Sequence, residues 1–149
     1  MSAFSHRVAY RAVAGAWFAV LALSGPALAQ CSSPDAGRWV KAGGDPEQIE
    51  VYFASCGDTA GAETHMGVKV FVRQSSGGLY QRTPVKAVYV VDKNTRWLLA
   101  KVPTGGYVDK MWMRVVSGRD HQNVLRVFIK HESLDSKPSA SEWAEYRRR

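Results

Sequence analysis

The chain lacks several features that would point to a particular chemistry. Only two of its 149 residues are cysteines, and the three histidines beyond residue 29 are not spaced as H-x-x-x-H or H-x-H. This argues against a zinc site of the standard kind, which draws on cysteine and histidine. Neither G-x-S-x-G nor G-x-x-x-x-G-K occurs, so the hydrolase nucleophile elbow and the phosphate-binding loop are missing as well. The sequence predicts no catalytic motif, no metal site and no cofactor.

Long apolar runs are also missing, with one exception at the start of the chain. Arg7 and Arg11 precede an apolar run over residues 12–23. Gly25-Pro26 follows the run, and Ala27-Leu28-Ala29 is a cleavage site of the A-x-A type. The run, about 12 residues long, is shorter than the roughly 20 that a membrane-spanning helix needs. We predict that residues 1–29 are a cleaved secretory signal peptide and that no transmembrane segment remains after cleavage.

Export gives the two cysteines a simple interpretation. Gln30 occupies the place before Cys31 where a lipoprotein signal requires a small residue, so we expect cleavage after Ala29 and no lipid anchor. In the periplasm or outside the cell, Cys31 and Cys56 would meet oxidising conditions, and we predict a disulfide between them. Closing the loop of 24 residues between them would contribute about 3 kcal/mol to stability.

The expected mature domain, residues 30–149, has a moderate excess of basic residues. It contains 18 Lys and Arg against 13 Asp and Glu, because two of the 20 basic residues belong to the signal peptide, and its formal charge is therefore +5. This charge favours anionic surfaces but is too small to indicate nucleic-acid binding.

Helical periodicity is absent beyond residue 29. Seven or eight short apolar–polar alternations appear instead, separated by turn-forming residues. They cover residues 37–40, 47–54, 68–73, 85–91, 95–102, 107–116 and 123–130, with a closing segment at 142–146. Residues 55–67 are expected to form a loop, which could include a poor strand around residues 63–66. The pattern predicts an all-β fold in a single domain, a small antiparallel up-and-down β-barrel of about eight strands. The alternative is a β-sandwich.

The clearest strand pair is a hairpin expected over residues 107–131. A turn near Asp120 would place Met111 opposite Ile129 and Met113 opposite Val127 on the core side. A slip of one residue would set apolar side chains opposite basic ones on both faces, so burial favours the first register.

The outer face of this hairpin is the candidate binding site. It carries four cations around two aromatic rings, namely Lys110, Trp112, Arg114, Arg126, Phe128 and Lys130. Such a face would bind an anionic partner, for example an acidic polysaccharide, a phosphate group or an acidic protein. The alternative is a solvated strand face whose cations lie over the rings or extend into water.

The same register places Asp109 opposite His131 at the end of the core face. An acid beside a histidine can orient a general base. The sequence nominates no nucleophile and no metal that would complete a catalytic site, so we interpret the two residues as an ion pair at the barrel rim.

The segment Gly37-Arg38-Trp39 resembles the G-x-W motif of the calycins, the lipocalin and avidin group of small meander barrels. The position of Cys31 shortly before it is similar to the avidin arrangement. In these families a basic residue near the last strand packs across the tryptophan at the closed end of the barrel. Here Arg126 is the candidate, and Arg147-Arg148-Arg149 is interpreted as a solvated end. The stretch from Arg96 onward also resembles uncharacterised exported bacterial proteins.

These observations favour an exported, non-enzymatic barrel that binds a small ligand in its interior or an anionic partner on its outer face. The alternative is an inhibitor of a secreted hydrolase, acting through an exposed loop such as residues 56–67. An enzyme built around Asp109 and His131 is the least favoured of the three.

Overall fold

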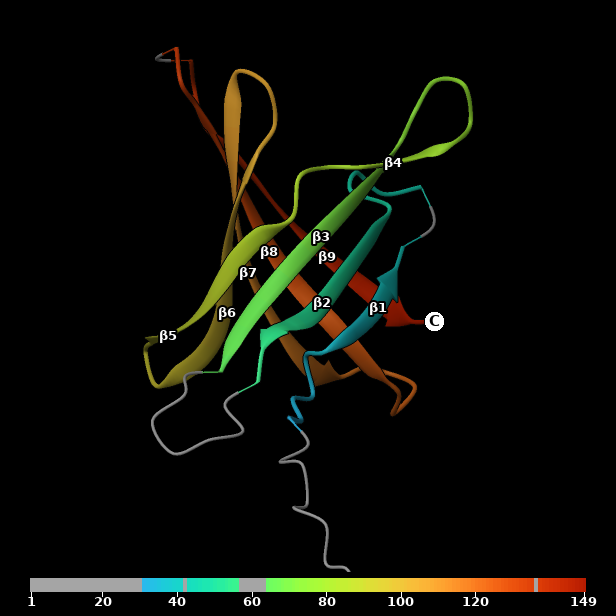
Figure 1. The fold of residues 1–149 in the computed structure, drawn as a ribbon, viewed down its shortest axis with the longest axis vertical. Helices are drawn as coiled ribbons and strands as arrows, with labels where there is room; N and C mark the ends of the chain where they lie inside the picture. Colours follow the sequence, from blue (N-terminus) through green and yellow to red (C-terminus); the bar gives the residue numbers. More distant parts are fainter. Residues whose placement is uncertain (1–30, 42, 57–63, 136) are drawn as a thin grey trace, which may run out of the picture.

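The structure is a computed structural model that describes residues 31–41, 43–56, 64–135 and 137–149. Among these residues there are nine β-strands and no helix (Figure 1). The strands are β1 (Gly37–Val40), β2 (Gln48–Ser55), β3 (His65–Arg73), β4 (Leu79–Gln81), β5 (Val85–Asp92), β6 (Thr95–Pro103), β7 (Tyr107–Ser117), β8 (Asn123–Ser133) and β9 (Ala140–Arg148).

Eight of these strands close into an antiparallel barrel. The order around the ring is β1-β2-β3-β5-β6-β7-β8-β9, and the ring closes where β1 pairs with β9. The closing seam is short, with two residue pairs, Trp39 with Arg148 and Val40 with Arg147. β4 is an additional strand that pairs with β3 alone. The predicted up-and-down barrel is confirmed, and the sandwich alternative is wrong.

The barrel is filled at its centre. Successive side chains of a strand point to opposite faces, so alternate residues of each strand point inward. On β7 and β8 the inward set includes Met111, Met113, Leu125, Val127 and Ile129, each at most 1% exposed. Trp39 from β1 and Tyr146 from β9 are the largest fully buried side chains. Two hollows, of about 470 and 330 Å³, lie at the two ends of the barrel.

The predicted register of the β7–β8 hairpin is confirmed. Met111 lies opposite Ile129 and Met113 opposite Val127, and on the outer side Trp112 lies opposite Phe128. The register follows from the alternation itself, because only this pairing buries both apolar sets.

The strand β3 begins earlier than the loop expected over residues 55–67 would allow. It begins at His65, within the stretch where a poor strand was considered, and Gly67 pairs with Tyr52 of β2. A Cβ atom at position 67 would collide with the Tyr52 ring, which lies across the glycine. Gly67 is therefore a strand residue that makes room for a neighbouring ring, and its lack of a side chain hid the alternation. Residues 57–63 lie outside the described residues.

The predicted disulfide between Cys31 and Cys56 is formed. It ties the segment before β1 to the end of β2, because Cys56 directly follows Ser55, the last residue of that strand. The expected signal peptide, residues 1–29, lies outside the described part of the chain.

The end of the barrel near β1 is organised around Trp39. The indole Nε1 donates a hydrogen bond to the Asp35 carbonyl oxygen at 2.9 Å. The guanidinium carbon of Arg148 lies 4.7 Å from the ring centroid, and Nη2 donates to the carbonyl oxygens of Pro34 (2.9 Å) and Ala36 (3.1 Å). In Figure 1 the C-terminal end of β9 lies beside β1.

The expectation that Arg126 packs across Trp39 is wrong. Arg126, the sequence candidate for the residue over Trp39, points to the outer face of β8 and pairs with Glu145. Arg148 takes the position over the indole, because the β1–β9 register sets it directly beside Trp39. All three C-terminal arginines are exposed, as expected of a solvated end, and Arg148 contacts Trp39 as well.

Candidate functional site

The end of the barrel opposite Trp39 contains a linked set of polar groups. As the predicted register requires, Asp109 of β7 lies opposite His131 of β8, and their Oδ1 and Nδ1 atoms are 2.6 Å apart. Asp109 is buried, with 7% of its surface exposed, because it continues the inward-facing set of β7. Its other oxygen, Oδ2, accepts a hydrogen bond from Arg82 Nη1 at 3.4 Å.

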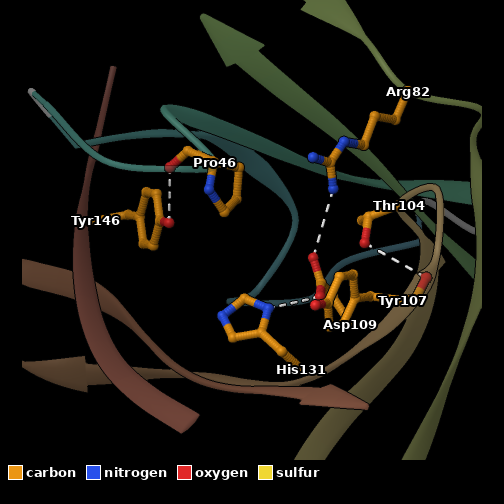
Figure 2. A network of polar contacts seen from close by, with 7 residues as sticks. All are labelled: Pro46, Arg82, Thr104, Tyr107, Asp109, His131 and Tyr146. Atoms are coloured by element: carbon orange, nitrogen blue, oxygen red, sulfur yellow. Dashed lines mark hydrogen bonds and ion pairs between the residues drawn. The ribbon is translucent and has the colours of Figure 1, made fainter. Parts of the chain in front are cut away.

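Arg82 is the member of this set that sequence reasoning missed. It lies in the connection between β4 and β5, where no alternation of apolar and polar residues predicts whether its side chain points into the barrel. Its backbone N–H donates to the Val70 carbonyl oxygen at 2.9 Å, which holds this connection against β3. Figure 2 shows the guanidinium reaching from this segment toward Asp109. A buried carboxylate requires such partners, because an unpaired charge in the barrel end would be costly.

These side chains border a hollow of about 330 Å³. Its lining consists of Asp45, Arg82, Thr104, Tyr107, Asp109, His131, Pro138 and Ala140. The β1–β2 connection comes close on the opposite side of the view, where the Tyr146 hydroxyl donates to the Pro46 carbonyl oxygen at 2.8 Å (Figure 2). Burial raises the pKa of Tyr146, so this hydroxyl remains protonated and keeps donating at neutral pH.

The hollow presents one imidazole nitrogen and few other free side-chain groups among its described lining residues. The Nδ1 atom of His131 is committed to Asp109, and its side chain is 33% exposed, which leaves Nε2 as its second polar atom. Among the described residues the lining contains no serine, cysteine or lysine, and the hydroxyl of Thr104 is directed to the Tyr107 carbonyl oxygen at 3.4 Å. The Asp109–His131 pair thus fixes an imidazole in place, and no described lining residue is a serine or cysteine nucleophile beside it.

The six residues predicted as a binding face do lie together on the outer surface of β7 and β8. Three of their cations are paired with carboxylates. Glu132 lies 2.6 Å from Lys110 and 2.9 Å from Lys130, and Glu145 lies 2.8 Å from Arg126. Hydrogen bonds from Lys110 and Lys130 lower the pKa of Glu132 to about 2, so it bridges the two like charges as a carboxylate.

The fourth cation of this face, Arg114, lies over an aromatic ring. Its guanidinium carbon is 4.7 Å from the centroid of Trp97, and its Nε atom is covered, with no hydrogen-bond partner among the described residues. This is a cation–π contact of the kind that the sequence offered as an alternative to anion binding, but its ring is Trp97 of β6 and not one of the two rings of the predicted face. The face is therefore less basic than its sequence implies.

Two tryptophans of the outer face were missed by the sequence reasoning. Trp97 of β6 and Trp143 of β9 lie together with Trp112 and Phe128, and these four residues form the ring cluster. The alternation in β6 and β9 could have shown that both tryptophans face outward. That they meet the rings of β7 and β8 follows only from the order of the strands around the barrel.

The hollow at the Trp39 end, of about 470 Å³, surrounds a second buried acid, Asp35. Its oxygens accept hydrogen bonds from the Tyr89 hydroxyl at 3.0 Å and the Val115 N–H at 3.1 Å. Burial raises the pKa of Tyr89, which keeps the donor protonated. Asp35 thus ties the segment before β1 to β5 and β7, and its partners give it a structural role.

Within the described ranges, no three His, Cys, Asp or Glu side chains gather where they could hold a metal ion. No helix long and apolar enough to cross a membrane occurs in the same part of the chain. Comparison with protein-family models, curated proteins and solved structures finds no match to this chain. The loop considered for hydrolase inhibition, residues 56–67, falls mostly outside the described residues.

Proposed function

We propose that this protein is an exported, non-enzymatic barrel that binds a small polar ligand in the hollow beside Asp109. The observation that carries the proposal is the arrangement of Arg82 and His131, both held by one buried carboxylate at the edge of a hollow of about 330 Å³. Fixed polar groups around a concave site are typical of small-molecule binding. The signal-like residues 1–29 and the disulfide support export.

Arg82 gives the ligand its expected chemistry. A guanidinium group has five N–H donors, and Arg82 uses its side chain for one hydrogen bond among the described residues. Its remaining donors match the two oxygens of a carboxylate. The lining also includes Asp45, an exposed acid that would favour a ligand carrying a donor or a positive group as well. A small amino acid or hydroxy acid has both features.

The packed centre of the barrel limits the size of the ligand. Met111 and Ile129, the inward residues next to Asp109 and His131, are each 1% exposed. A long apolar ligand would have to displace these side chains, whereas a small polar molecule needs the barrel end alone. The resemblance to calycins is part of the proposal, and the packing of Arg148 on Trp39 at the opposite end supports it.

The test is a thermal-shift screen of the purified mature protein against amino acids, small hydroxy acids and, for comparison, long-chain fatty acids. We expect members of the first two groups to raise the melting temperature, and calorimetric titration of these compounds to show binding about tenfold weaker or more in Arg82→Ala. Arg119→Ala, which removes an exposed arginine from the β7–β8 turn, is the matched control and should bind like the wild type.

Two results would refute the proposal. One is a screen in which no small acid stabilises the wild-type protein. The other is an Arg82→Ala variant that folds, by circular dichroism, and binds the same compounds with unchanged affinity. Stabilisation by fatty acids alone would also contradict it, because the ligand would then occupy the barrel centre.

A further inference from the structure

The ring cluster covers the outer side of four neighbouring strands. Trp112 of β7 contacts Phe128 of β8 with ring centroids 5.6 Å apart, and Phe128 contacts Trp143 of β9 at 4.9 Å. The ring centroids of Trp97 of β6 and Trp143 are 6.1 Å apart. These rings lie on the outside of the barrel, so the packing of its core does not explain them.

Trp143 is the most accessible member of the cluster, with 59% of its surface exposed. Beside it lies a hollow of about 410 Å³, lined by Arg126, Trp143, Ala144 and Glu145. Large exposed aromatic surface next to a hollow marks an interaction site, because leaving an indole in water has no benefit for folding.

The charges around the cluster identify the kind of partner. Arg126 is paired with Glu145, the two lysines share Glu132, and Arg114 lies over Trp97. A polyanion would have to compete with these carboxylates for three of the four cations. A neutral partner would meet an indole face bordered by a guanidinium donor and a carboxylate acceptor, both already held in place.

We propose that this face binds a neutral glycan chain. A sugar ring has an apolar face of C–H groups that stacks on an indole, and a rim of hydroxyl groups that both donate and accept hydrogen bonds. Trp143 supplies the stacking surface. Arg126 donates to the rim hydroxyls, and Glu145 accepts from them, without either residue losing its partner.

The tilt of the rings fits a single glycan chain better than the flat surface of a crystalline polysaccharide. Neighbouring rings of the cluster are inclined to one another by 42° to 51°. A flat surface would touch one ring at a time, whereas a flexible chain can bend from one ring to the next. The proposal concerns a different surface from the hollow beside Asp109, so the failure of either leaves the other standing.

The test titrates the purified protein with cellohexaose, maltohexaose and chitohexaose and follows tryptophan fluorescence and calorimetric heat. We expect at least one of these hexasaccharides to bind, and Trp143→Ala to weaken that binding by about tenfold or more. Glu145→Gln tests the polar rim and should weaken the same binding by a smaller factor. The control is Tyr80→Ala, since Tyr80 is an aromatic residue of β4 with comparable exposure, 53%.

The proposal is overturned if none of the hexasaccharides binds the wild type, or if Trp143→Ala binds them unchanged. Salt-sensitive retention on heparin without hexasaccharide binding would also overturn it and would identify the face as a polyanion site. Because Trp143 is exposed, its replacement by Ala should leave the far-ultraviolet circular dichroism spectrum of the barrel intact.

Discussion

The contact between Arg148 and Trp39 should make a large contribution to the stability of the barrel. Arg148→Ala removes a cation–π contact, worth about 0.5 to 2 kcal/mol, and the donors to the carbonyl oxygens of Pro34 and Ala36. A hydrogen bond from a charged group contributes about 1.5 to 3 kcal/mol when buried. These two are exposed, and water can replace them, so together we count them as about 1 kcal/mol.

The expected loss in free energy of unfolding is therefore about 1.5 to 3 kcal/mol. The place of the contact supports the upper part of this range, because Arg148 lies in a seam between β1 and β9 that has two residue pairs. Arg148→Lys keeps the charge near the ring but loses the fork that reaches both carbonyl oxygens, so its loss should be intermediate.

The measurement is urea unfolding of the mature domain, followed by tryptophan fluorescence and circular dichroism in parallel. Arg147→Ala is the matched control, since Arg147 is the neighbouring arginine and pairs with Asp120 in an exposed salt bridge whose removal should cost under about 1 kcal/mol. If the two alanine variants unfold with the same free energy, the contact on Trp39 does not stabilise the barrel and the reasoning is wrong.

Three further predictions concern other parts of the barrel. Gly67→Ala should lower the free energy of unfolding by about 1 to 2 kcal/mol, because the added methyl group displaces the Tyr52 ring; an equal loss in a Tyr52→Ala background would refute this cause. Reducing the Cys31–Cys56 disulfide should lower it by about 3 kcal/mol, and identical urea midpoints with and without reductant would contradict this. The pKa of Glu132 is lowered in the folded state to about 2, so the stability that it contributes is present above pH 4.5 and is lost as the pH falls toward 2. Glu132→Gln should remove this part of the acid dependence, and an unchanged difference in stability between pH 6 and pH 3 would show that the lysine contacts do not act on folding.

The β7–β8 hairpin could be predicted in detail because its contacts are local. Two alternating segments joined by a short turn leave one register that buries both apolar sets, so Met111 and Ile129 were paired correctly. The same register correctly brought Asp109 to His131. The disulfide was equally determined, since the expected mature chain offers one pair of cysteines.

The charge balance of the outer face could not be predicted in the same way. The predicted register implies that Lys110 lies opposite Lys130, as the structure shows, but the alternation gave no rotamer for Glu132, whose carboxylate bridges them. Glu145 reaches Arg126 from β9, and this contact could not be predicted because the sequence did not indicate how the closing segment pairs with β8. Two carboxylates therefore offset two of the four positive charges on a face that was expected to attract anions.

The sequence by itself determined the strand alternation, the barrel class, the hairpin register and the disulfide, because each depends on residues close in the chain or on a single possible pairing. Tertiary structure alone decided that Arg148 covers Trp39, that Arg82 reaches Asp109 and that Trp97 meets Trp143. The Arg148 contacts join residues more than 100 positions apart, and the other two depend on which strands or connections become neighbours when the ring closes. No local pattern encodes such neighbours, since closure is a property of the whole barrel.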